Sequence, residues 1–366
     1  MKDEIISVRQ GVILIILFTL GSAILIGTAG VAKQNGWIAI IIALLFSIIL
    51  MLMFSRILSL HPGKDLFDIL EIVMGKALGK ILSMLMIWFA FHLGALVMRN
   101  LSEYTSIIVF TDTPVVVPMG FFVLLLIWAL KEGIEVMARW SEFFIWIVML
   151  IFILVSLLSI PQLDISKLKP IFGDGFAPIL KGTFSAISFP FGEIIVFTMV
   201  FSNISKTKNY NKIFIIGLLI GGITIFLAKL RNLLVLGSEM ESRVYFPSTM
   251  AISLIHVGRS LERLEMGVTI ILLLCSFTKI MICIFAVCNG LSKVFGFDDY
   301  RFISTPVTLL MFSFSFMIYK NTMEMSFFAF EVWPYYSFPF EVILPFLVFI
   351  MVEIRNRRLS VANIPK

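Results

Sequence analysis

Two ionisable residues stand inside long apolar runs of the sequence. Glu193 lies near the centre of run 179–201, and Lys279 lies near the middle of run 264–289. An ionised side chain at the middle of a bilayer costs several kcal/mol unless it is paired or hydrated. We therefore expect the two to pair. They either flank a polar cavity, in which Lys279 or the backbone amides of interrupted helices meet a ligand carboxylate, or form an ion pair that holds two helices together. Cys283 lies one turn after Lys279 and is a further candidate for the site.

Two of the apolar runs also contain residues that interrupt a helix. They are Gly21, Ser22 and Ala23 in run 10–31, and Pro190, Phe191 and Gly192, directly before Glu193, in run 179–201. Proline removes a backbone donor and glycine tolerates irregular dihedrals, so both helices should open near mid-membrane. Opened backbone can bind an anion such as an amino-acid carboxylate. One break alone indicates a simple kink, whereas two breaks at matching places favour a ligand-binding site.

The composition excludes a water-soluble enzyme. Of the 366 residues, 60% are hydrophobic and 14% are charged, whereas soluble chains have about 25% charged residues. The formal net charge is +6, but the basic residues lie in short segments between apolar runs, where positively charged cytoplasmic loops place them. We therefore expect a polytopic protein of the lipid bilayer and no nucleic-acid partner.

The sequence has no recognisable catalytic or metal-binding constellation. Cys275, Cys283 and Cys288 share one apolar run, and the first and last would lie about 20 Å apart along a helix. The three histidines are scattered, and we expect His92 to be a hydrogen-bonded core residue. The phosphate-loop and dinucleotide fingerprints are missing from the sequence. We expect no enzyme, no metal and no cofactor.

Ten apolar runs are long enough to cross a bilayer as helices, which takes about 20 residues. They are 10–31, 37–58, 80–109, 115–131, 140–160, 179–201, 212–236, 264–289, 302–319 and 337–354. We expect a single all-α transmembrane domain over 1–366, in which repeat one covers about 10–160 and repeat two about 179–354. With ten spans both termini share a side. That side holds 17 of the lysines and arginines against seven in the opposite loops, so both termini are predicted to be cytoplasmic.

Several further features are expected at the outer side. Residues 161–178 form a turn-rich loop, and the apolar stretch 250–257 within 237–263 is too short to span, so it should form a surface or re-entrant helix. Arg99 and Glu103 at i and i+4 should pair. Lys229 and Arg231, near the outer end of run 212–236, are expected to have a structural or gating role.

Four motifs, taken in order, resemble those of a known family. They are Leu20-Gly21-Ser22-Ala23, Leu168-Lys169-Pro170-Ile171-Phe172-Gly173-Asp174-Gly175, Ser188-Phe189-Pro190-Phe191-Gly192-Glu193 and Asn289-Gly290-Leu291. Together they are similar to the B subunits of bacterial spore germinant receptors, over nearly the whole chain. That family belongs to the amino acid-polyamine-organocation superfamily, so the resemblance implies a LeuT-like 5+5 inverted repeat with the first and sixth helices broken.

The resemblance also implies where a ligand would bind. In this fold the ligand lies among the two breaks and the middle parts of the third and eighth spans. Phe89 and Leu93, at i and i+4 in the third span, would form an apolar wall on one helical face, although without the fold ordinary packing is the better explanation of these two residues.

The function implied by the resemblance is nutrient sensing. The chain would lie in the spore inner membrane, bind a small nutrient such as an amino acid, and trigger germination through an A subunit and a lipoprotein C subunit. The alternative is a proton-coupled amino-acid transporter of the same fold, with a proton on Glu193. A third possibility, an ion-channel component, is disfavoured because the sequence lacks charged rings.

Overall fold

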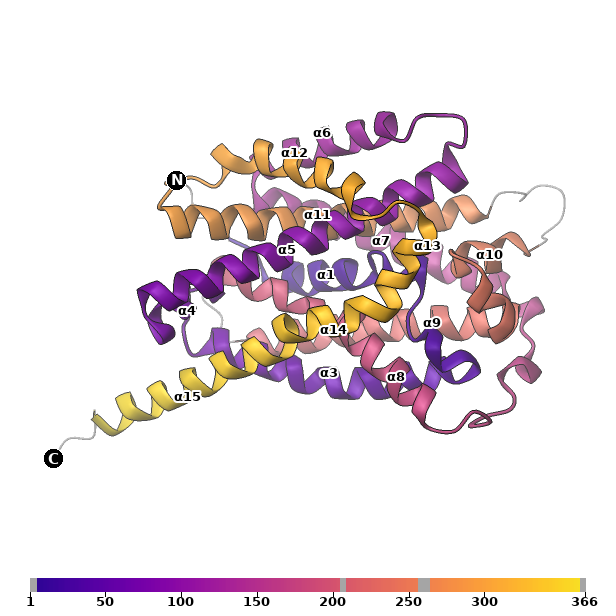
Figure 1. The fold of residues 1–366 in the computed structure, drawn as a ribbon, viewed down its shortest axis with the longest axis horizontal. Helices are drawn as coiled ribbons and strands as arrows, with labels where there is room; N and C mark the ends of the chain where they lie inside the picture. Colours follow the sequence, from indigo (N-terminus) through magenta and orange to yellow (C-terminus); the bar gives the residue numbers. More distant parts are fainter. Residues whose placement is uncertain (1–4, 205–208, 256–263, 363–366) are drawn as a thin grey trace.

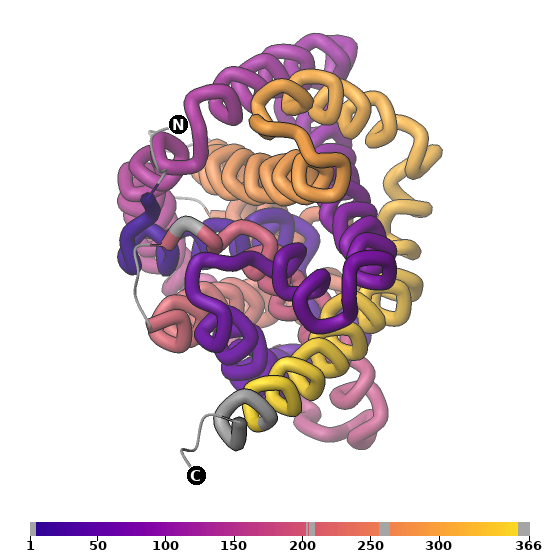
Figure 2. The backbone as a smooth tube through the Cα atoms, turned by 90° about the vertical axis from the view of Figure 1, so that its left-hand side faces the viewer, coloured from indigo at the N-terminus to yellow at the C-terminus, as the bar shows by residue number. Residues whose placement is uncertain are grey.

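The computed structural model describes residues 5–204, 209–255 and 264–362, and these are almost entirely helical. The long helices lie lengthwise beside one another (Figure 1), and Figure 2 looks along them. The start of α1 and the end of α15 lie at the same end of the bundle as α4, while α10 lies at the opposite end (Figure 1). We call these the α4 end and the α10 end.

Fifteen α-helices occur in the described residues. They are α1 (Val8–Leu20), α2 (Ala23–Ile26), α3 (Gly36–Ser59), α4 (Leu66–Met74), α5 (Lys76–Tyr104), α6 (Val116–Glu132), α7 (Ile134–Leu158), α8 (Ala177–Ala186), α9 (Tyr210–Arg243), α10 (Pro247–Ser253), α11 (Glu265–Phe295), α12 (Arg301–Ile318), α13 (Thr322–Phe327), α14 (Trp333–Phe338) and α15 (Leu344–Ala362).

Short 3-10 and π-helical segments connect or extend them. They are η1 (Gly30–Asn35), η2 (Thr105–Val109), η3 (Ile160–Gln162), η4 (Ile165–Leu168), η5 (Ile187–Phe191), η6 (Gly192–Met199), η7 (Phe201–Asn203), η8 (Phe328–Val332) and η9 (Pro339–Ile343).

Nine helical stretches of the described chain are long and apolar enough to cross a membrane. The predicted run 115–131 corresponds to α6, which has 17 residues and is about 26 Å long, slightly less than the hydrocarbon core. The chain therefore has the predicted ten spans only if α6 also crosses the membrane. The last predicted run, 337–354, is part of a longer stretch from Thr322 to Arg357.

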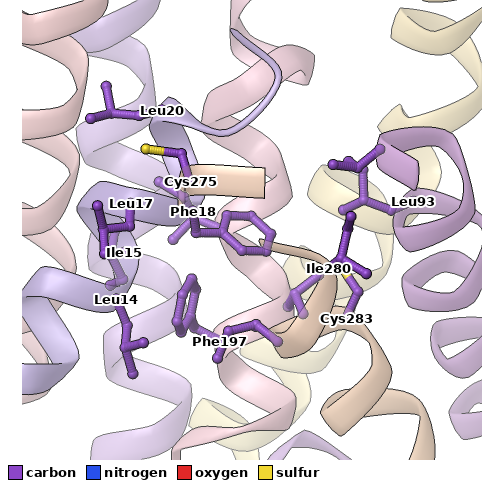
Figure 3. Packing of buried hydrophobic residues seen from close by; sticks show 14 of the residues in the cluster. Leu14, Ile15, Leu17, Phe18, Leu20, Leu93, Phe197, Cys275, Ile280 and Cys283 are labelled. Carbon is purple, nitrogen blue, oxygen red and sulfur yellow. The ribbon is translucent and has the colours of Figure 1, made fainter. Parts of the chain in front are cut away.

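Burial separates inner from outer helices. Of the 18 most apolar consecutive residues of the α1–α2 stretch, 83% are buried, whereas the corresponding share in α7 is 22%. Phe18 of α1 and Phe197 of η6 meet edge to face with ring centroids 5.1 Å apart (Figure 3). The outward faces carry large exposed side chains such as Leu45 and Leu150, as expected of a surface that contacts lipid.

At the α10 end, the loop between α7 and α8 is bonded to η1. Asn35 accepts a hydrogen bond from the backbone N–H of Phe172 at 3.2 Å, and Lys33 pairs with Asp174 at 3.2 Å. These contacts fasten the expected turn-rich loop beside the end of the first span. The short helix expected in 250–257 begins earlier, as α10, and residues 256 and 257 lie outside the described residues.

Candidate functional site

The first helix stops and restarts in its middle. Helix α1 ends at Leu20, Gly21 has φ 4° and ψ −122°, and α2 begins at Ala23. A side chain at position 21 would place its Cβ 2.7 Å from Cδ of Lys279 and 2.9 Å from the carbonyl oxygen of Phe18. Glycine is thus needed here because the Lys279 side chain crosses the break.

The sixth span is interrupted at its proline. Helix α8 ends at Ala186, and Phe189 has the extended values φ −130° and ψ 111° within η5. The peptide bond from Phe189 to Pro190 is cis. The chain continues as the 3-10 helix η6 from Gly192.

An ion pair joins the two breaks to α11. Nζ of Lys279 lies 2.5 Å from Oε2 of Glu193, and both side chains are buried at 0% and 1% exposure. The same ammonium lies 5.0 Å from the ring centroid of Phe18 and 5.3 Å from that of Phe189, within cation–π range. The predicted pairing therefore forms, and it links α1, η5, η6 and α11.

A cavity of about 30 Å³ lies between the breaks and α5. Three predicted site residues line it, namely Ser22, Leu93 and Glu193. The hydroxyl of Ser22 is buried without a hydrogen-bond partner among the described residues. This volume has room for about one or two water molecules, so any amino acid would require the walls to move apart.

The other predicted site residues surround this cavity without lining it. Phe89 stacks at 5.8 Å on Trp333, which lines the cavity, and at 5.1 Å on Phe340. Cys283 is buried against α5 beside Gly94 and lies close to Leu93 in Figure 3. The remaining members form the breaks themselves or lie directly beside them; they are Gly21, Ala23, Pro190, Phe191, Gly192 and Lys279.

Much of the cavity wall is absent from the predicted set. Nine lining residues lie outside that set, and they are Ile26, Leu96, Val97, Asn100, Phe189, Tyr319, Phe328, Ala329 and Trp333. Four of them, Tyr319, Phe328, Ala329 and Trp333, lie before the last apolar run, in a segment where the sequence predicts neither a helix break nor a buried charge. Glu341 of η9 was also missed, although an acid within run 337–354 carries the same signal as Glu193.

The environment of His92 differs from expectation. Its Nδ1 has no hydrogen-bond partner among the described residues. The ring instead packs within an aromatic cluster, meeting Tyr336 edge to face at 5.1 Å and stacking on Trp88 at 5.7 Å. The prediction of a hydrogen-bonded histidine is wrong at this nitrogen, because α5 faces aromatic side chains there.

A second, larger cavity of about 430 Å³ opens at the α10 end. Ile26 lines both cavities, and the segment 328–330 contributes to both walls. We call these residues the partition. Within the larger cavity Lys229 pairs with Glu241 at 2.9 Å, and both side chains are buried.

Arg231 and Arg99 make further polar contacts at this end. Arg231 donates to Oδ1 of Asn232 at 3.0 Å, and Asn232 donates to Ser248 of α10 at 3.0 Å. The predicted pair of Arg99 and Glu103 forms at 2.7 Å.

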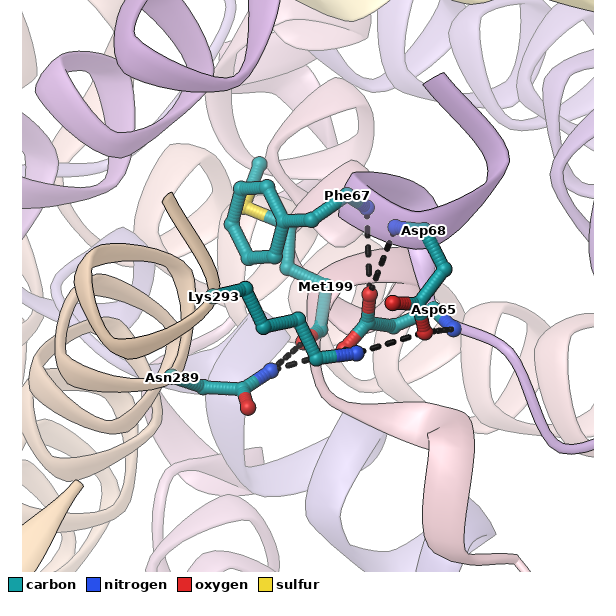
Figure 4. A network of polar contacts seen from close by, with 6 residues as sticks. All are labelled: Asp65, Phe67, Asp68, Met199, Asn289 and Lys293. Atoms are coloured by element: carbon teal, nitrogen blue, oxygen red, sulfur yellow. Dashed lines mark hydrogen bonds and ion pairs between the residues drawn. The ribbon is translucent and has the colours of Figure 1, made fainter. Parts of the chain in front are cut away.

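A polar network closes the α4 end (Figure 4). Asp65 caps α4 by accepting from the N–H groups of Phe67 and Asp68 at 3.1 and 3.2 Å. It also accepts from Asn289 at 2.8 Å and pairs with Lys293 at 2.7 Å. Burial raises the pKa of Asp65, and the ammonium of Lys293 opposes that rise. The charge of Lys293 thus helps to keep this carboxyl ionised.

Asn289 extends the network to the end of the sixth span. Its amide also donates to the carbonyl oxygen of Met199 at 3.0 Å. Helices α4 and α11 and segment η6 are therefore joined by one side chain (Figure 4). We call Asp65, Asn289 and Lys293 the latch.

Broken helices around a small cavity, within a bundle of membrane-spanning helices, define a transporter-type membrane fold. A solved structure of Mhp1, a nucleobase-cation-symport-1 family transporter in a closed conformation with bromovinylhydantoin bound, superposes with a TM-score of 0.63. The match covers 96% of this chain and 90% of that one at 13% identity, so it establishes the fold alone.

Residues 5–325 match the family model described as spore germination protein, and the chain belongs to that family. Spore germination protein KB of Bacillus subtilis (strain 168) is 28% identical over 98% of this chain and 97% of its own length. Spore germination protein A2 of the same organism is 24% identical over 95% of each chain. The resemblance stated from the motifs is confirmed.

Proposed function

We propose that this chain is the nutrient-sensing B subunit of a spore germination receptor. The observation that carries the proposal is the cavity between the two helix breaks, where the unpartnered hydroxyl of Ser22 and the carboxylate of Glu193 face one space. A nutrient that fits an expanded form of this cavity favours one conformation over another by its differential affinity. The repeats 10–160 and 179–354 would each contribute one break.

The cavity chemistry supports a small neutral amino acid as the nutrient. The amino group would meet Glu193, and the carboxylate would meet Ser22 and the backbone N–H groups freed by the breaks. The aromatic and aliphatic wall, which includes Leu93, Phe189 and Trp333, suits an apolar side chain. Lys279 would act through Glu193, because its ammonium is fully buried and is not part of the cavity wall.

Binding to the purified full chain tests this assignment. We expect calorimetry to detect at least one small neutral amino acid, and Ser22→Ala to weaken it about fivefold, as loss of one hydrogen bond of about 1 kcal/mol predicts. Ser47→Ala is the matched control, since the hydroxyl of Ser47 is also buried without a hydrogen-bond partner in the described ranges and does not line the cavity. Equal effects of the two substitutions would contradict the site.

The alternative function is a proton-coupled amino-acid transporter of the same fold. Vesicles that contain this chain alone distinguish the two. A sensor binds the labelled amino acid without accumulating it, whereas uptake driven by a pH gradient would establish transport.

We further propose that the chain lies in the spore inner membrane with both termini cytoplasmic and assembles with an A subunit and a lipoprotein C subunit. Family membership supports this assembly. The assembly is tested by copurification from solubilised spore membranes. Recovery of the chain without either subunit would contradict it.

A further inference from the structure

Glu341 is a buried carboxyl group that does not line the proposed nutrient site. It lies in η9 and is fully buried. The hydroxyl of Ser337, one turn earlier and also fully buried, donates to its Oε2 at 3.1 Å. Its Oε1 is buried and has no hydrogen-bond partner among the described residues.

The carboxyl packs against the start of η6. A side chain at Gly192 would place its Cβ in overlap with Oε2 of Glu341, so the glycine lets the carboxyl reach the broken helix. The next residue is Glu193, whose own carboxylate is paired with Lys279 at 2.5 Å. Two carboxyl groups, one from η6 and one from η9, therefore share a neighbourhood with one ammonium group, that of Lys279 in α11.

The charges of this neighbourhood do not balance when both carboxyls are ionised. Lys279 can neutralise one of them, and its short contact is with Glu193. Glu193 and Lys279 are the ionisable groups that act on Glu341 from the packed elements. An uncompensated carboxylate is strongly disfavoured in a membrane interior. Glu341 must therefore be neutralised by a proton or by a cation.

The surroundings favour the proton. A hard metal ion is held by several oxygen ligands, often carboxylates, and no group of three or more His, Cys, Asp or Glu residues occurs in the described part of the chain. A proton needs one oxygen, and Oε1 of Glu341 is unengaged. With Oε2 accepting from Ser337, the neutral acid fits the contacts that are present.

We propose that Glu341 is a proton-binding site, which holds one proton beside the broken sixth span and keeps η9 packed against Gly192. Release of the proton would place a second negative charge beside the Glu193–Lys279 pair and push η9 away from η6. The proposal rests on the chain's own residues and stands whether the protein senses or transports.

Infrared spectroscopy of the purified full chain in lipid tests the proposal directly. A protonated carboxyl gives a C=O stretch separate from the carboxylate bands, and the band shifts in D₂O. We expect wild type to show such a band at neutral pH and Glu341→Gln to lose it. Glu103→Gln, which neutralises a carboxyl that pairs with Arg99, should retain the band.

Two further measurements keep the test decisive. Ser337→Ala should move the band to higher frequency, because it removes the hydrogen bond to Oε2, and this result stands even where Glu341→Gln fails to fold. Wild type without the band at neutral pH, or a band that persists in Glu341→Gln, overturns the proposal. Loss of the wild-type band on addition of Na⁺ or K⁺ would assign the site to a metal cation and likewise overturn it.

Discussion

Lys279 is connected to more parts of the candidate site than any other residue that the sequence singled out. Its aliphatic chain crosses the first break at Gly21, and its ammonium reaches Glu193 and the rings of Phe18 and Phe189. A buried ion pair gains little overall, because desolvation offsets the attraction, yet removal of one partner leaves a buried charge alone. The pair is therefore best understood through the difference between single and double substitutions.

We predict that Lys279→Met lowers the free energy of unfolding by about 3–5 kcal/mol, since it strands the Glu193 carboxylate. The double variant Lys279→Met with Glu193→Gln should recover most of that loss. Thermal unfolding in detergent would measure both. Arg139→Met, which breaks an exposed pair with Glu135, is the control and should change stability by no more than about 0.5 kcal/mol. A double variant as unstable as the single one would argue against the pair.

The residue scale also shows what the sequence can predict. The energetic penalty of an intramembrane charge was enough to pair Glu193 with Lys279. The same penalty applies to Glu341, which the sequence-based prediction of the site does not include. Tyr319 and Trp333 could not be found in this way, because apolar and aromatic residues face lipid as readily as a cavity.

At the scale of elements, the breaks were predictable and the closures at the two ends were not. Glycine and proline restrict backbone conformation locally, so Gly21 and Pro190 mark the interruptions without any knowledge of packing. The latch joins residues more than 200 positions apart, and such contacts depend on the packing of α4 against α11. Asn289 belongs to one of the family motifs, but the sequence does not identify Asp65 and Met199 as its hydrogen-bond partners.

We predict that Asn289→Ala loosens the α4 end of the bundle. It removes the bridge from α11 to Asp65 and to Met199, so α4 should open more often. Hydrogen–deuterium exchange should be faster in peptides that cover Leu66–Met74 and the end of η6. Ser292→Ala is the control on the same helix, because the Ser292 hydroxyl is buried and has no hydrogen-bond partner in the part of the chain that the structure describes. Unchanged exchange in Asn289→Ala would show that α4 is held by other contacts.

At the scale of the whole molecule, the two ends are closed by different means. The latch joins helices at the α4 end by charged and polar contacts, whereas the partition at the α10 end consists of Ile26 and the short segment 328–330. Moving a thin apolar partition breaks fewer polar contacts than opening the latch. A nutrient would therefore reach the central cavity most easily through the larger cavity, and the orientation of the molecule decides which compartment that cavity faces.

The predicted orientation places the larger cavity outside. The loop with Lys320, at the α10 end, should be outside, and the loop with Lys64, after α3, should be cytoplasmic. Both residues are exposed, whereas Cys275, Cys283 and Cys288 are fully buried and should stay unlabelled. We expect a membrane-impermeant maleimide to label Lys320→Cys in intact cells and to label Lys64→Cys only after the cells are lysed. The reverse pattern would show that the larger cavity faces the cytoplasm. An external nutrient could then not reach the central cavity through the partition.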